Sequence, residues 1–273
     1  MAKTSRMTRT LGAAAATAAL AFGGVVALPG AAQAADADRY YIQVGGTGPT
    51  KPAPECTFTY DPANAAHQLG DRAIKVCYPA SWGPVIGPTG SLIDITTGQV
   101  HPEALTAPTY DTSVRIGIEE TLKVAERTHR DHPDAQLTIV GYSQGAQVAD
   151  EVLQKISRGE TGIDKSQVDG KLYADPMQPG TGFGAVVPKG LGVPGVATSP
   201  GAGPTDFNGV PVTRYCINGD PVCDANLLNT PGYFELHPNY AEDNNAIERT
   251  MTEDSGNGVQ WLNPDGTPAP PRA

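Results

Sequence analysis

The apolar positions of the chain fall into short runs separated by segments with helical spacing. Five runs of apolar and β-branched residues predict strands at 40–44, 73–78, 136–140, 171–174 and 212–217. After a capping Asp111, one helix face collects Val114, Ile118, Leu122 and Ala125, and a second helix is predicted over 146–156. Strands that alternate with helices predict an α/β domain on a parallel sheet of about five strands, flanked by helices.

The segments outside these elements set the limits of the domain. Periodicity disappears over 79–108 and 176–211, where Gly and Pro recur every few residues, and loops of this length are usually either functional lids or disordered insertions. The last stretch, 253–273, is rich in Gly, Asn and Pro and is expected to be a flexible tail. We therefore expect a single domain over 35–252.

The first 34 residues have the pattern of a secretory signal peptide. Lys3, Arg6 and Arg9 precede an alanine-rich apolar run that ends in Ala32-Gln33-Ala34, a small-residue cleavage signature. Cleavage is expected between Ala34 and Ala35, and the mature protein is expected to be secreted. Loss of the three basic residues takes the formal net charge from −10 to about −13. Because no Lys/Arg cluster relieves this acidity, a nucleic-acid partner is not expected.

The four cysteines favour two disulfides over a metal site, because a secreted chain folds in an oxidising compartment. Three pairings are open. Cys216 and Cys223 bracket one short loop, and Cys56 and Cys77 flank one early unit. We expect these two local pairs, and we expect neither a metal nor a cofactor.

The most informative local motif joins the predicted strand at 136–140 to the helix at 146–156. Gly141-Tyr142-Ser143-Gln144-Gly145 has the G-x-S-x-G pattern of the nucleophile elbow of α/β hydrolases. The two glycines let neighbouring backbone pass a sharp turn without a Cβ. This context predicts Ser143 as a nucleophile, whereas the motif alone is equally typical of a plain glycine-rich turn.

An α/β hydrolase carries its acid and then its histidine after the nucleophile. Of the five histidines, only His237 follows Ser143, so His237 is the predicted base. Asp220 is the predicted acid, because it stands in a turn after the strand at 212–217 and inside the expected Cys216–Cys223 bridge, which would hold it rigidly. Asp224 is the alternative. The other acids in the right order are Asp164, Asp169, Asp175, Asp206 and Glu235.

The oxyanion hole should combine the backbone N–H after the nucleophile, that of Gln144, with a donor from a loop after an early strand. Gly45-Gly46-Thr47-Gly48 follows the first predicted strand, and the Thr47 hydroxyl is the expected second donor. The alternative is an ordinary flexible turn. Four apolar residues near the expected triad indicate either an acyl-binding groove or core positions: Leu227, Leu228, Phe234 and Leu236.

These residues resemble two related groups of serine hydrolases. Cys216-Ile217-Asn218-Gly219-Asp220-Pro221-Val222-Cys223 followed by His237-Pro238-Asn239-Tyr240 is similar to the bracketed acid and downstream histidine of cutinases. The segments 45–50, 76–80 and 141–146 resemble the PE-PPE hydrolase domain of actinobacteria. The resemblance implies a cutinase-like α/β-hydrolase fold, a triad of Ser143, Asp220 and His237, and ester hydrolysis without a cofactor.

The chain also departs from both groups. No PE or PPE helical segment precedes the hydrolase portion, the Cys56–Cys77 pair does not resemble the first cutinase disulfide, and 176–211 is longer than a compact cutinase needs. We predict a monomeric esterase that acts on an ester or lipid-like small molecule, with transient contact to the cell envelope or a lipid surface. Two alternatives are an acyltransferase with the same triad and a catalytically silent envelope-binding protein.

Overall fold

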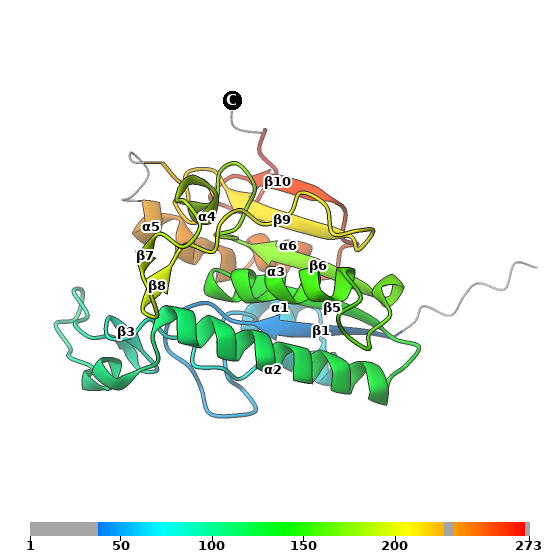
Figure 1. Cartoon of the computed structure of the whole chain (residues 1–273), viewed down its shortest axis with the longest axis horizontal. Coiled ribbons are helices and arrows are strands. Elements are labelled where there is room, and N and C mark those ends of the chain that lie inside the picture. Colours follow the sequence, from blue (N-terminus) through cyan, green and yellow to red (C-terminus); the bar gives the residue numbers. More distant parts are fainter. Residues whose placement is uncertain (1–37, 227–231, 271–273) are drawn as a thin grey trace, which may run out of the picture. The chain divides into compact units, whose positions relative to one another are not determined.

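The computed structural model describes residues 38–226 and 232–270, so the predicted signal peptide lies outside the described residues. A six-stranded sheet organises this part of the chain, in the order β10-β9-β6-β5-β1-β2, and all its neighbouring strands run parallel (Figure 1). The strands are β1 (Arg39–Val44), β2 (Ala73–Lys75), β5 (Gln136–Tyr142), β6 (Val168–Tyr173), β9 (Val212–Ile217) and β10 (Gly258–Leu262).

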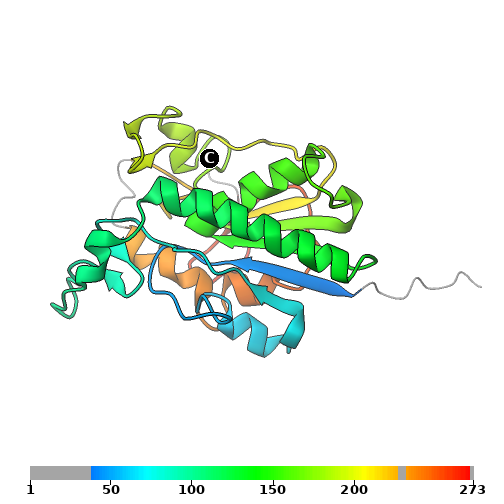
Figure 2. The ribbon, with the colours of Figure 1, turned by 60° about the horizontal axis from the view of Figure 1, so that its bottom comes forward.

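Helices cover both faces of the sheet (Figure 2). On one face lie the two long helices α2 (Tyr110–Asp131) and α3 (Gln144–Ser157), and on the other lie α1 (Asp61–Ala66) and α6 (Ala246–Thr250) with the 3-10 turn η4 (His237–Ala241). Successive strand residues point to opposite faces, so Ile139 joins the core under α3 while Val140 joins the second core. Central strands are therefore apolar on both sides, as in other parallel sheets.

The two irregular segments contain only short elements. Residues 79–108 include β3 (Ile86–Gly87), β4 (Gly90–Ser91) and η2 (Pro102–Thr106), and 176–211 include α4 (Phe183–Val186), β7 (Gly192–Val193) and β8 (Ala197–Thr198). The remaining short elements are η1 (Gly70–Arg72), η3 (Lys165–Gln167) and α5 (Gly232–Glu235). In the described ranges, no helix has both the length and the apolarity to cross a membrane.

The sequence predicted five of the six strands of this sheet and missed one at its edge. The parallel sheet is confirmed, but residues 258–262, expected to lie in a flexible tail, form β10 and pair with β9. Two smaller expectations were also wrong: β2 ends at Lys75 and not at Tyr78, and Asp111 does not cap α2. Thr109 is the residue before the helix, and the Asp111 carboxylate instead accepts hydrogen bonds from Thr198.

A buried ionic cluster joins α3, the end of β6 and β9. Arg214 donates from Nε to Asp175 (2.7 Å) and from a terminal nitrogen to Asp150 (2.5 Å), and all three side chains are buried. Two carboxylates share one guanidinium. Burial, and then the charge of Asp175, therefore raise the pKa of Asp150 to about 8.

This raised pKa predicts a pH dependence of stability. In the unfolded chain an aspartate titrates near pH 4, so between about pH 5 and pH 7 the folded state holds a proton that the unfolded state has lost. The free energy of unfolding should then fall as pH rises, by at most about 1.4 kcal/mol per pH unit. Urea unfolding of wild type and Asp150→Asn across this range checks it. The free energy of unfolding of Asp150→Asn should vary less with pH than that of wild type. Equal slopes for the two proteins would contradict the raised pKa of Asp150.

Candidate active site

The turn after β5 places Ser143 at the carboxyl end of the sheet, immediately before α3. Its backbone has φ 57° and ψ −122°, a strained conformation for a residue with a side chain. A Cβ on Gly141 would lie 2.3 Å from the carbonyl oxygen of Gly145, and one on Gly145 would lie 2.2 Å from that of Val44. Both glycines are thus required by backbone contact, as the motif predicts.

Three residues far apart in the sequence meet at this turn. His237 Nε2 lies 2.8 Å from Ser143 Oγ, and His237 Nδ1 lies 2.9 Å from Asp220 Oδ2. An ionised carboxylate only accepts hydrogen bonds, so Nδ1 carries the proton and Nε2 is left to accept from the serine hydroxyl. All three side chains are buried. The geometry is that of a nucleophile, a base and an orienting acid.

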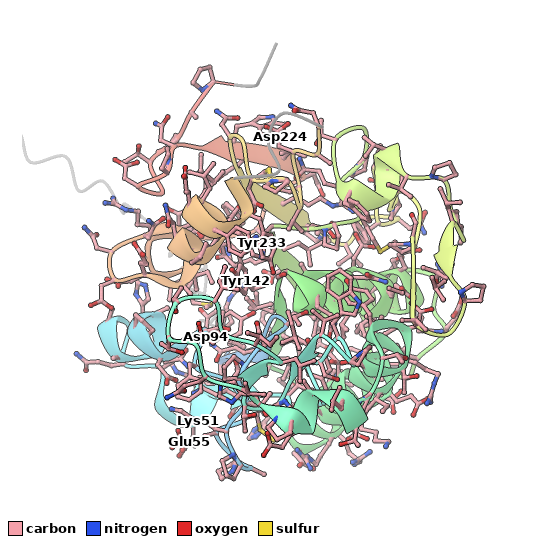
Figure 3. The ribbon with its side chains drawn as sticks, turned by 90° about the vertical axis from the view of Figure 1, so that its left-hand side faces the viewer. Lys51, Glu55, Asp94, Tyr142, Asp224 and Tyr233 are labelled. Atoms are coloured by element: carbon pink, nitrogen blue, oxygen red, sulfur yellow. A yellow bond between two sulfur atoms is a disulfide. The ribbon has the colours of Figure 1, made fainter. Side chains whose placement is uncertain are left out.

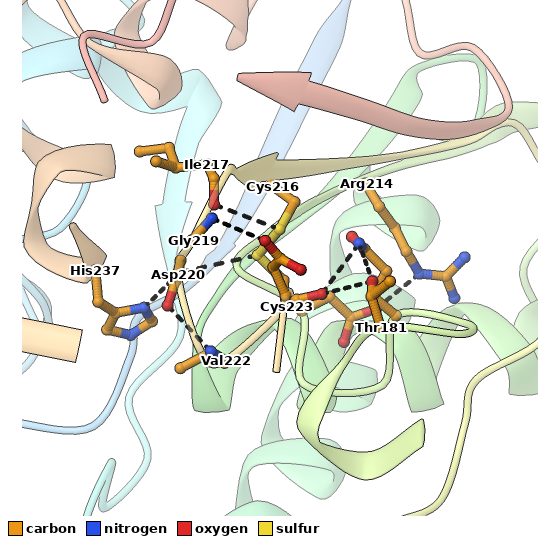
Figure 4. The surroundings of a disulfide bond; sticks show 12 residues. Thr181, Arg214, Cys216, Ile217, Gly219, Asp220, Val222, Cys223 and His237 are labelled. Carbon is orange, nitrogen blue, oxygen red and sulfur yellow. Dashed lines mark hydrogen bonds and ion pairs between the residues drawn. A yellow bond between two sulfur atoms is a disulfide. The ribbon is translucent and has the colours of Figure 1, made fainter. Parts of the chain in front are cut away.

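The acid sits in a cross-linked turn after β9 (Figure 4). Both predicted disulfides are present, and Cys216–Cys223 closes the turn that carries Asp220, whose Oδ1 accepts from Val222 N at 3.1 Å. Asp224, the alternative acid, binds the backbone of the same turn: its Oδ2 accepts a hydrogen bond from Gly219 N at 2.8 Å. Asp220 is therefore the carboxylate that the fold brings to the histidine.

The His237 ring lies between two tyrosines that the sequence analysis did not single out. Its ring centroid is 5.0 Å from that of Tyr142 and 4.9 Å from that of Tyr233, and both pairs are stacked. Figure 3 looks onto the carboxyl ends of the strands and shows the two tyrosines near the centre. Burial raises the pKa of both phenols, so they remain neutral beside the imidazole. Tyr142 also donates to the His237 carbonyl oxygen at 2.6 Å, which fixes that backbone.

The two predicted oxyanion donors lie at the same cavity as Ser143. Gln144 is the first residue of α3, where the N–H groups have no acceptor within the helix, and Thr47 lines the cavity beside it. Tyr78 donates to the carbonyl oxygen of Gly45 at 2.5 Å, which anchors the loop that carries Thr47. This arrangement can supply two donors to a developing negative charge.

A buried polar triangle fixes the Gln144 side chain. Ser81 N donates to Ser113 Oγ (3.1 Å), Ser113 Oγ donates to Gln144 Oε1 (2.8 Å), and Gln144 Nε2 donates to the Ser81 carbonyl oxygen (3.1 Å). The three residues come from different parts of the chain and are buried. No pattern in the sequence connects them, so this support of the elbow could not be predicted.

A cavity of about 650 Å³ opens beside Ser143. Its lining is largely apolar and comes from the two irregular segments and the acid turn, including Trp82, Phe183, Val187, Leu191 and Val222. Phe234 and Leu236 do not line this cavity: Phe234 is exposed, whereas Leu236 packs against the second core, in line with the alternative of core positions. Leu227 and Leu228 lie outside the described residues. Within the described ranges, no His, Cys, Asp or Glu cluster could hold a metal ion.

The parallel sheet, the strand-elbow-helix unit and the residues gathered at it define the class of α/β hydrolases. A sequence model of the family described as Cutinase matches residues 63–250, more than half of the chain. The chain belongs to the cutinase family and is a serine carboxylic ester hydrolase. A search of curated proteins found no match. The resemblance to PE-PPE hydrolases stays a prediction.

Solved structures with a similar course of the chain are more distant. The catalytic core domain of acetyl xylan esterase from Trichoderma reesei shares 22% identity, covers 73% of this chain and 91% of its own, and has a TM-score of 0.44. Lysin B from Mycobacteriophage D29 shares 18% identity, covers 72% of this chain and 71% of its own, and has a TM-score of 0.46. A cutinase-like protein from Cryptococcus sp. shares 17% identity, covers 68% of this chain and 79% of its own, and has a TM-score of 0.40. Membership of the family therefore depends on the sequence match.

Proposed function

We propose that this protein hydrolyses carboxylic esters through a triad of Ser143, His237 and Asp220. The observation that carries the proposal is the continuous chain of contacts from Ser143 Oγ through the imidazole to the Asp220 carboxylate. His237 takes the serine proton during attack on the ester carbonyl, and Asp220 stabilises the imidazolium that forms. Gln144 N–H and the Thr47 hydroxyl stabilise the oxyanion. Water then releases the acyl group from Ser143.

A fluorophosphonate probe followed by peptide mapping tests the proposal. The expected result is a single adduct on Ser143 together with turnover of soluble p-nitrophenyl esters. A folded protein with neither property would instead be a binding protein on a hydrolase scaffold. Analysis of the products with an added alcohol separates hydrolysis from transfer, because an acyltransferase would acylate that alcohol.

Apolar side chains around the cavity support contact with a lipid surface. The exposed large apolar residues gather in 82–105 and 183–193, and Phe58 and Phe234 are the others in the described ranges. Figures 1 and 2 place both segments at the carboxyl end of the sheet, where Ser143 lies. They contain two acidic residues and one lysine, Lys189. This favours a neutral ester surface over an anionic membrane. Such a role agrees with secretion, which the signal peptide predicts.

One exposed residue on each side tests the lipid contact. Ile95 is 81% exposed within 82–105, and Ile95→Glu should weaken binding to phosphatidylcholine vesicles about tenfold or more, since a fully buried isoleucine contributes about 1.5–3 kcal/mol. The matched control is Phe58→Glu, at an exposed aromatic outside the two segments, which should bind as wild type does. Sedimentation with vesicles measures both variants. Equal binding by Ile95→Glu and wild type would contradict this contact.

A further inference from the structure

One wall of the cavity beside Ser143 is a separate hairpin. β7 and β8 pair antiparallel within the excursion from β6 to β9, and Leu191, Ala197 and Pro200 of this segment line the cavity. The sheet and its two cores are complete without the hairpin. Its presence therefore needs an explanation other than folding.

The hairpin lies beside the start of α2 (Figures 1 and 2), and hydrogen bonds hold it there. The Asp111 carboxylate accepts from Thr198 N at 2.8 Å and from Thr198 Oγ1 at 3.0 Å, and Thr109 Oγ1 donates to the Gly195 carbonyl oxygen at 2.6 Å. Apolar packing adds little, because Leu191 and Val193 are mostly exposed. A few polar contacts therefore decide where the wall stands.

A second cavity, of about 500 Å³, lies behind the same segment. Thr198, Ser199 and Pro200 line both cavities, so the chain at these residues forms a partition between them together with Gln147 of α3, which also lines both. Arg115 and Glu151 contribute to the second cavity, which is more polar than the one at Ser143. Because packed interiors resist deformation, a partition with a cavity on each side is the part of the wall that can shift.

We propose that the β7–β8 hairpin, through the Asp111–Thr198 contacts, determines how long an acyl chain the active site accepts. The inference rests on the proposed ester hydrolysis. A short or medium acyl chain fits in the cavity at Ser143 with the partition in place. An acyl chain long enough to reach the partition has to move it toward the second cavity and break the Asp111–Thr198 bonds. Asp111 and Thr198 are thus specificity-determining residues for the acyl group.

The test measures kcat/KM for p-nitrophenyl butyrate, octanoate and palmitate, which share one alcohol. Thr198→Val removes the hydroxyl and keeps the branched shape, and it should raise the palmitate-to-octanoate ratio about fivefold, as expected for the loss of one hydrogen bond. Asp111→Asn should act in the same direction. The matched control Thr198→Ser keeps the hydroxyl and should keep the wild-type ratio.

The possible outcomes separate this inference from the function on which it rests. Unchanged ratios in folded Thr198→Val and Asp111→Asn, or an equal loss with all three esters, would overturn the inference. If either variant fails to fold, Thr109→Val tests the attachment of the same hairpin at Gly195, with the same expected change and the same contradicting result. Fluorophosphonate labelling of wild-type Ser143 reports independently on the proposed hydrolysis. If Ser143 is labelled but the ratios are unchanged, the proposed hydrolysis stands and only the specificity role of the hairpin is overturned.

Discussion

Ser143→Ala is expected to lower kcat for p-nitrophenyl butyrate by about 10⁴- to 10⁶-fold while the protein stays folded. The change removes the atom that attacks the ester, whereas its neighbours stay in place: the loss of one buried hydroxyl leaves the elbow glycines and the α3 packing untouched. Steady-state kinetics measures the loss, and circular dichroism with thermal unfolding checks the fold.

Ser166→Ala is the matched control for this substitution. Ser166 is an exposed serine in η3 whose hydroxyl donates only to a nearby aspartate, Asp164, so the variant should turn over the ester at the wild-type rate. Fluorophosphonate labelling should be lost in Ser143→Ala and retained in Ser166→Ala. If Ser143→Ala kept a rate within tenfold of wild type, the assignment of the nucleophile would be wrong.

The largest loss of stability is expected at Arg214, in the buried ionic cluster. Arg214→Met keeps a similar length but leaves Asp150 and Asp175 buried without their cation. Removing one partner from a buried ion pair typically destabilises by about 3–5 kcal/mol. Urea unfolding at pH 7 measures the change.

Two further variants serve as controls for Arg214→Met. Arg158→Met breaks an ion pair with Glu160 that is half exposed on both sides, and it should change the free energy of unfolding much less. Adding Asp175→Asn to Arg214→Met removes the carboxylate that is left without its cation and should recover part of the loss. No recovery in the double variant would show that lost packing of the Arg214 stem, and not charge, explains the effect.

The parts of the site that sequence reasoning predicted are those with a local or ordered signature. The elbow glycines stand at a fixed spacing between a strand and a helix, and this context predicts the turn, although Gly145 is required by the passing backbone of the distant Val44. His237 was identified because order along the chain left no other histidine after Ser143. Asp220 was preferred over Asp224 because cysteines bracket its turn, and the structure directs Asp220 to the imidazole.

The parts that sequence reasoning missed depend on contacts between distant segments. Ser113 lies on α2 and Gln144 on α3, 31 residues apart, and no periodicity in the sequence predicts their hydrogen bond. The cavity lining comes from loops such as those of Trp82 and Phe183, whose Gly- and Pro-rich sequences carry no regular pattern. β10 was missed because it is an edge strand: with one pairing partner and a partly exposed sequence, it lacks the apolar run of a central strand.

The short bridge Cys216–Cys223 has a consequence for how this protein should be produced. In the chain-entropy model, a cross-link between residues seven apart restricts the unfolded chain less than a longer loop would, and it contributes about 2–3 kcal/mol to stability. It does hold the backbone on which Asp220 meets His237. Material made in a reducing cytoplasm would lack this bridge and also Cys56–Cys77, so it should be less stable as well as a poor enzyme, and only the oxidised protein would report the true rate.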